Sequence, residues 1–200
     1  MSDNGFTIRW PRKSINTQKI IEANSKLPPA VLNAQVEKAK EILSCCVPYD
    51  AGIGSKKVGL VVGKVQSGKT TSFSLLTSLA ADNGYKIIIH LLGTTTNLKA
   101  SNAQDVKKVL CSDDDDNYWN SFDVTTSNVK ESTDGLEQIL YEANNSGLDF
   151  LGDREDNVMY FYLLKNHSVI NKFAKEIEDF HSNLRRSNEP LPIMIIDDEV

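Results

Sequence analysis

Residues 63 to 70 have the types and the spacing of a loop that binds phosphate groups. Gly63, Gly68, Lys69 and Thr70 fill every fixed position of the pattern G-x-x-x-x-G-K-[ST]. The glycines let the backbone curl, so that successive N–H groups point at phosphate oxygens. The Lys69 ammonium would then contact the β- and γ-phosphates, and the Thr70 hydroxyl would ligate Mg²⁺. The residues expected to bind the nucleotide are Gly63, Val65, Gln66, Ser67, Gly68, Lys69, Thr70 and Thr71.

Three carboxylates follow an apolar run close to residue 200. Residues 193–196 are all apolar and lead into Asp197, Asp198 and Glu199. An ATPase with such a phosphate loop also needs an apolar strand that ends in a carboxylate holding Mg²⁺. Asp198 is the favoured metal contact, and Asp197 is the alternative because it directly follows the run. Glu199 is the expected general base, so Lys69 and Glu199 are the expected catalytic residues.

These segments, taken together, resemble a known family of ATPases. The stretches V-G-K-V-Q-S-G-K-T-T, G-Y-K-I-I-I-H-L-L-G-T-T-T-N-L and I-I-D-D-E look like a superfamily II helicase-type ATPase. In particular, they resemble the phosphate-loop (P-loop) region of bacterial and phage proteins that carry the Z-one domain, described as endonucleases. The resemblance spans roughly residues 56 to 200, and Val200 stands where that family usually has alanine. It implies a second RecA-like domain with an arginine finger and a nuclease-like domain downstream.

Two polar segments directly follow apolar runs and are candidates for contact with nucleic acid. By resemblance to helicases, the segment 93–99 would touch the nucleic-acid backbone through Thr94, Thr96, Asn97 and Lys99. The alternative is a polar loop in which Thr96 or Asn97 caps the next helix. The segment 165–167 (Lys-Asn-His) is a similar candidate. DNA is favoured over RNA as the partner.

Hydrophobic periodicity predicts alternating strands and helices. Buried strands are expected at 58–62, 85–92, 158–164 and 193–196, and a further strand at 119–126. Helices are expected near 30–44, 69–82 and 98–110, as a short segment around 136–140, and from a cap at Ser168 to about 184. His90 lies inside an apolar strand and is expected to be a core residue whose hydrogen bonds are satisfied. Strands alternating with helices predict an α/β domain around a largely parallel sheet.

The composition limits the classes of protein that the chain can belong to. The 200 residues are 40% hydrophobic and 24% charged, which is ordinary for a globular domain. The net charge of −5 argues against a function based on a bulk basic surface, although a local basic groove stays open. Three cysteines without ligand spacing indicate reduced thiols and a cytoplasmic protein, and no apolar stretch is long enough for a membrane. The aspartates 113–116 are expected to form a solvated loop rather than a metal site.

The sequence therefore predicts a RecA-like P-loop domain, a three-layer α/β sandwich, at residues 56–200. A helical extension is expected at 1–55, and the domain is expected to be incomplete after Val200. The expected function is that of a helicase- or translocase-like ATPase that binds ATP and Mg²⁺ and acts on nucleic acid. One alternative is an interaction module that depends on nucleotide without hydrolysing it. The other, a small kinase, is less favoured because few arginines follow the loop.

Overall fold

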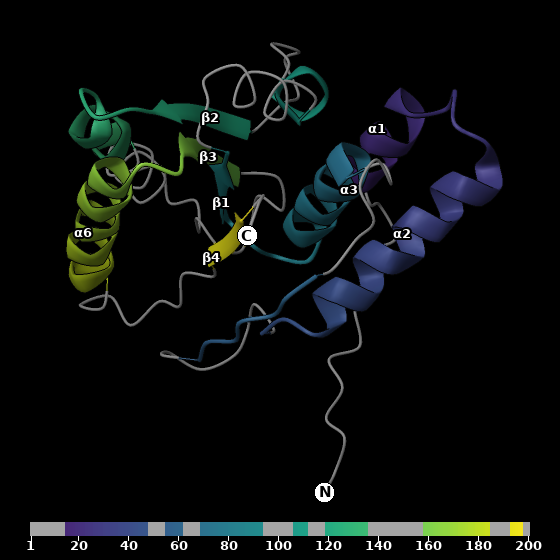
Figure 1. Cartoon of the computed structure of the whole chain (residues 1–200), viewed down its shortest axis with the longest axis horizontal. Helices are drawn as coiled ribbons and strands as arrows, with labels where there is room; N and C mark the ends of the chain where they lie inside the picture. Colours follow the sequence, from purple (N-terminus) through teal and green to yellow (C-terminus); the bar gives the residue numbers. More distant parts are fainter. Residues whose placement is uncertain are drawn as a thin grey trace, which may run out of the picture.

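A parallel sheet of four strands forms the centre of the molecule (Figure 1). The structure is a computed structural model that describes residues 15–47, 55–61, 69–93, 106–111, 119–135, 158–184 and 193–197. The strand order is β2–β3–β1–β4, and each neighbouring pair is parallel. The strands are β1 (Ile87–Leu92), β2 (Trp119–Val124), β3 (Val158–Leu164) and β4 (Ile193–Asp197). The expectation of an α/β fold around a parallel sheet is therefore confirmed.

Helices cover both faces of this sheet. The helices α1 (Ile15–Ala23), α2 (Pro29–Ser44) and α3 (Lys69–Asp82) lie on one side, and α6 (His167–Leu184) lies on the other (Figure 1). Two shorter helical segments occupy residues 106–110 and 129–135. The part of the chain that the structure describes therefore has three layers, with the sheet in the middle.

The two inner strands are buried on both faces, which explains their nearly continuous apolar sequences. In β3, Tyr160 and Tyr162 face the core shared with α1 to α3, whereas Met159 and Phe161 face the core under α6. Successive residues of a strand point to opposite faces, so one strand serves both cores. The strand β1 alternates in the same way, and Ile88 is fully buried in the first core.

The helix α2 confirms its predicted bounds and its predicted apolar stripe. Its buried residues are Leu32, Val36, Ala39 and Leu43. They recur at steps of four and three residues, which places them on one face of a helix. Pro29 stands at the first turn, where its missing N–H would have no partner within the helix. The stripe packs into the core that α2 shares with α3 and the sheet.

One carboxylate joins the end of α3 to the start of α1. Asp82 accepts hydrogen bonds from the backbone N–H of Asn16 at 3.2 Å and of Thr17 at 3.0 Å. It also accepts from the Asn16 amide at 2.9 Å and from the Thr17 hydroxyl at 2.5 Å. Burial raises the pKa of Asp82, although these four hydrogen bonds act in the opposite direction. Asp82 thus caps α1 from a distant point in the sequence, a contact that no local pattern predicts.

Two expectations about local structure are wrong. Residues 55–61 form no strand, and Val58 is 95% and Leu60 72% exposed. A parallel strand depends on a neighbour distant in the sequence, and a short apolar run that contains Gly59 does not specify one. The cap of α6 is Asn166 rather than Ser168, because its Oδ1 accepts from the Ser168 backbone N–H at 2.9 Å. The helix expected around 136–140 and the aspartates 113–116 lie outside the described residues.

We predict that Asp82→Ala detaches α1 from the sheet layer and lowers the free energy of unfolding by about 1–3 kcal/mol, because four donors lose their acceptor. Urea unfolding would give the loss, and amide hydrogen exchange over residues 15–23 would locate it. The matched control is Asp179→Ala on the exposed face of α6, where the change should stay within about 0.5 kcal/mol. Equal losses in both variants would contradict the capping role.

Candidate functional site

The carboxyl ends of three strands meet at one edge of the sheet. Leu92 of β1 is in register with Leu164 of β3, and Leu91 is in register with Asp197 of β4. The residue after β3 is Lys165, so a lysine and an aspartate emerge at the same edge. Ligands of open parallel α/β sheets bind outside this edge. The edge is therefore the place to look for a functional site.

An ion pair occupies this edge. The Lys165 Nζ lies 2.5 Å from the Asp197 Oδ1, and the two side chains are 21% and 46% exposed. The backbone N–H of Lys165 donates to the Leu92 carbonyl at 2.9 Å, which fixes the start of the loop after β3 against β1. The carboxylate of Asp197, one of the two candidate metal contacts, thus already has a cation as its partner.

The first turn of α3 lies toward the same edge. The helix leads through the short turn 83–86 into β1, and its middle residue Thr77 contacts His90 near the far end of β1. The helix therefore runs back along the sheet, and Thr77 is about 12 Å along the axis from the start at Lys69. The N-terminus of α3, which is the positive end of the helix dipole, therefore lies toward the carboxyl ends of the strands.

The start of α3 also contacts the helical extension. The Thr71 hydroxyl donates at 3.3 Å to the Oδ1 of Asn24, the residue after α1, and the Ser74 hydroxyl donates to the Thr70 carbonyl at 3.0 Å. A cavity of about 160 Å³ adjoins Thr71, Asn24 and Lys108. The extension thus helps to shape the surroundings of two residues that the sequence predicts to bind nucleotide.

The predicted site residues are only partly within the described structure. Thr70, Thr71 and Asp197 are described, and Lys69 is described as the first residue of α3. Thr70 and Asp197 come from elements that end at the same edge of the sheet. The following predicted residues lie outside the described ranges: Gly63, Val65, Gln66, Ser67, Gly68, Thr94, Thr96, Asn97, Lys99, Asp198 and Glu199.

The chemistry of the donor set fits magnesium bound together with phosphates. Thr70 offers a hydroxyl and Asp197 a carboxylate, and Mg²⁺ prefers such oxygen ligands. Among the described residues, no group of three or more His, Cys, Asp and Glu side chains could hold a metal by itself. Mg²⁺ held by these two residues would need waters and substrate phosphates as its further ligands.

His90 is a core residue, as expected. Its Nε2 lies 2.8 Å from the Thr77 hydroxyl and its Nδ1 lies 2.9 Å from the Tyr160 hydroxyl. Burial lowers the pKa of His90 to about 3, so the imidazole is neutral near pH 7. The histidine therefore joins α3, β1 and β3 through two hydrogen bonds and leaves no nitrogen for catalysis.

Two of the three thiols are not activated as nucleophiles. All three cysteines are free, as expected for reduced thiols. Burial raises the pKa of Cys46, and it raises the pKa of Cys111 to about 12. Only a thiolate is nucleophilic, so neither of these side chains is activated.

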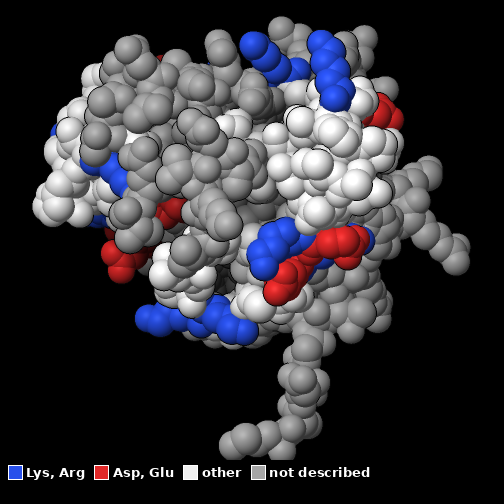
Figure 2. All heavy atoms as spheres, turned by 45° about the vertical axis from the view of Figure 1, so that its right-hand side comes forward, with Lys and Arg blue, Asp and Glu red and all other residues white. Residues whose placement is uncertain are grey.

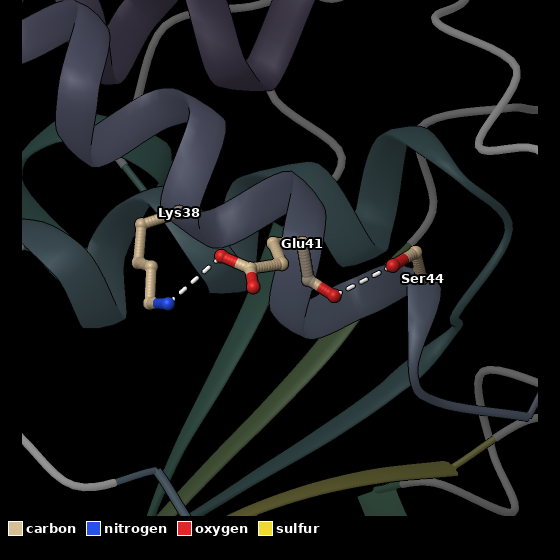
Figure 3. A network of polar contacts seen from close by, with 3 residues as sticks. All are labelled: Lys38, Glu41 and Ser44. Carbon is tan, nitrogen blue, oxygen red and sulfur yellow. Dashed lines mark hydrogen bonds and ion pairs between the residues drawn. The ribbon is translucent and has the colours of Figure 1, made fainter.

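The outer surface of α2 is an ordinary solvated helix face. The Lys38 Nζ lies 2.8 Å from the Glu41 carboxylate, and the Ser44 hydroxyl donates to the Glu41 carbonyl at 2.6 Å (Figure 3). Lys40 and Glu37 form a second pair at 2.6 Å. Exposed pairs of this type contribute little to stability and do not indicate a site.

A larger cavity of about 390 Å³ lies between α6 and the sheet. Its lining is apolar apart from Glu178 and includes Phe173, Ile177 and Ile195. The residues that line it include no basic side chain that could bind a phosphate. It is therefore distinct in chemistry from the polar edge of the sheet.

Comparisons of the chain with family models, with curated proteins and with solved structures give no match. Functional inference therefore rests on the motifs and on the geometry of the sheet edge. No described helix is both long enough and apolar enough to cross a membrane.

The partner of Asp197 is not among the sequence-based predictions. The sequence predicts the segment 165–167 as a contact with nucleic acid, but it does not pair Lys165 with an acidic strand end. The available signal was that both residues directly follow predicted parallel strands, whose carboxyl ends share one edge. The strand order decides which ends come close, and that order is not visible in a local pattern.

We predict that the buried His90 makes the fold sensitive to acid. Because His90 binds a proton less readily when folded, stability is fully present above the unfolded pKa of about 6.5 and falls as the pH drops toward 3. Between pH 7 and 5 the loss attributable to His90 is about 2 kcal/mol.

The measurement is urea unfolding of the wild type and of His90→Gln at both pH values. The wild-type protein should lose about 2 kcal/mol more than the variant between pH 7 and 5, since glutamine does not titrate. A difference between the two proteins that is the same at both pH values would contradict the prediction.

Proposed function

We propose that the chain is the nucleotide-binding domain of a helicase- or translocase-like ATPase that binds ATP with Mg²⁺ and acts on nucleic acid. The observation that carries the proposal is the G-x-x-x-x-G-K-[ST] match at residues 63–70, followed by a helix that begins at Lys69. The acidic end of β4 supports it, because Asp197 emerges at the edge toward which that helix points.

The proposed fold is the RecA-like P-loop arrangement. Its support is the all-parallel sheet, the helix α3 after the phosphate loop and the acidic residues after β4. The exposed, irregular run 55–61 gives no support, because this arrangement places a strand before the loop. The proposal therefore depends on the loop–helix junction and on β4 rather than on the segment that precedes the loop.

The residues that the sequence predicts for the site have defined roles in this proposal. Bound Mg²⁺ would neutralise charge on the β- and γ-phosphates, and Thr70 and either Asp197 or Asp198 would hold it. Lys69 would orient the outer phosphates, and the positive end of α3 would favour their negative charge. Glu199 would position and deprotonate the attacking water. Catalysis in such sites consists mainly of positioning and charge stabilisation.

The proposed nucleic-acid partner rests on the predicted contact residues in the segment 93–99 and on the described residues that follow them. The residues Thr94, Thr96, Asn97 and Lys99 precede the helical segment 106–110, which presents the exposed Lys108. On the face shown in Figure 2, the basic side chains of the described residues lie in separate small groups, one of them beside acidic side chains. Contact with the phosphate backbone would thus be local and not due to a broad basic field.

We predict that Lys69→Ala abolishes binding of a fluorescent ATP analogue, since the ammonium that contacts the outer phosphates is lost. Titration of the analogue into both proteins would show it, with circular dichroism as the test of folding. The matched control is Lys56→Ala, in an exposed stretch ahead of the loop, which should keep wild-type affinity. Unchanged affinity in Lys69→Ala would remove the nucleotide site.

We predict that single- or double-stranded DNA raises the rate of phosphate release and that the stimulation weakens as salt increases. Backbone contacts release counterions, so affinity falls steeply with ionic strength. A malachite-green assay at 50 and 200 mM salt would measure it. Nucleotide binding with no hydrolysis under any condition would favour the interaction module, and hydrolysis indifferent to DNA and RNA would contradict the nucleic-acid partner.

A further inference from the structure

The ion pair between Lys165 and Asp197 joins two strands that are not neighbours. β1 lies between β3 and β4, so the two outer strands of this trio are about 10 Å apart. The Lys165 side chain therefore extends across the carboxyl end of β1 to reach the Asp197 Oδ1 at 2.5 Å. It is 21% exposed, which shows that it lies along the edge of the sheet rather than in solvent.

The backbone around Lys165 is held on both sides. Its N–H donates to the Leu92 carbonyl at 2.9 Å, and the next residue, Asn166, caps α6 by accepting from the Ser168 N–H at 2.9 Å. The Asn166 carbonyl also accepts from the Ile170 N–H at 2.9 Å. If the ion pair breaks, the flexible side chain of Lys165 would therefore move while its backbone stays in place.

The ammonium and a metal ion compete for the same oxygen. Mg²⁺ binds carboxylate oxygens at about 2.0–2.1 Å, so a metal on Oδ1 would stand next to the ammonium that now contacts that atom. Two cations so close together repel each other. A metal on Oδ1 and the present contact of the ammonium with that atom therefore oppose one another.

We propose that Lys165 is the counter-cation of Asp197 in the nucleotide-free domain, that Mg²⁺ arriving with ATP displaces it, and that the released ammonium contacts the terminal phosphate. This inference rests on the proposed function, because it needs a nucleotide at the loop 63–70. The tethered backbone keeps Lys165 at the sheet edge, where the terminal phosphate brings the new negative charge. Lys165 thus balances the charge of Asp197 in one state and contacts the phosphate in the other.

The first test measures Mn²⁺ binding to the 200-residue chain without nucleotide, by electron paramagnetic resonance. Lys165→Gln should bind Mn²⁺ about two- to five-fold more tightly than the wild type, the range expected for removing a partly exposed ion pair. The gain should vanish in the Lys165→Gln/Asp197→Asn double variant. The matched control, Lys175→Gln on the exposed face of α6, should bind like the wild type.

The second test compares the affinities for Mg·ATP and Mg·ADP in the same proteins. Lys165→Gln should bind Mg·ATP about five-fold more weakly, because a charged hydrogen bond to the terminal phosphate is lost. Its affinity for Mg·ADP should not fall, and it should rise by up to the two- to five-fold gain expected for the metal alone. Tighter metal binding together with weaker ATP binding is a pair of opposite effects that a purely structural ion pair would not produce.

Two results would overturn the inference. One is Mn²⁺ affinity in Lys165→Gln equal to that of the Lys175→Gln control. The other is an equal loss of affinity for Mg·ATP and Mg·ADP. A wild-type chain that binds no nucleotide would overturn the proposed function and the phosphate contact with it, whereas the Mn²⁺ comparison decides the counter-cation role independently.

Discussion

The pairing of β1 with β3 imposes the constraint on which the rest of the molecule depends. Their six paired positions run from Ile87 opposite Met159 to Leu92 opposite Leu164, and nearly all of these side chains are buried. A parallel pair with apolar residues on both faces must be covered on both faces. The helices α1 to α3 cover one face and α6 covers the other, so the layers follow from this pair of strands.

The same constraint leaves the carboxyl ends of the strands as the place where polar side chains can meet a ligand. With both faces covered, the residues that can meet a ligand are those that follow the strands at their carboxyl ends. Lys165 and Asp197 occupy such positions after β3 and at the end of β4, and the start of α3 points toward them. The candidate site is thus a consequence of strand direction, because antiparallel pairing of β4 would have put Asp197 at the opposite edge.

Local patterns predicted the elements whose signal is complete within one segment. The strand 158–164 is one continuous apolar run, and the apolar residues of the helix 30–44 follow one helical period. The run 58–62 has a similar composition but forms no strand over its described residues, since pairing depends on a partner elsewhere in the chain. The Lys165–Asp197 pair was not predictable for a related reason, because it depends on the order of the strands in the sheet.

The buried histidine connects the stability of the core to the geometry of this edge. Thr77, His90 and Tyr160 form a chain of hydrogen bonds from α3 through β1 to β3, in a region almost without water. In such surroundings each partner must be satisfied, so the chain allows α3 only one rotation and one depth on the sheet. Rotation of α3 determines where its first turn points, and with it the positions of Thr70 and Thr71. A residue with no role in chemistry therefore helps to set the direction of the first turn of α3.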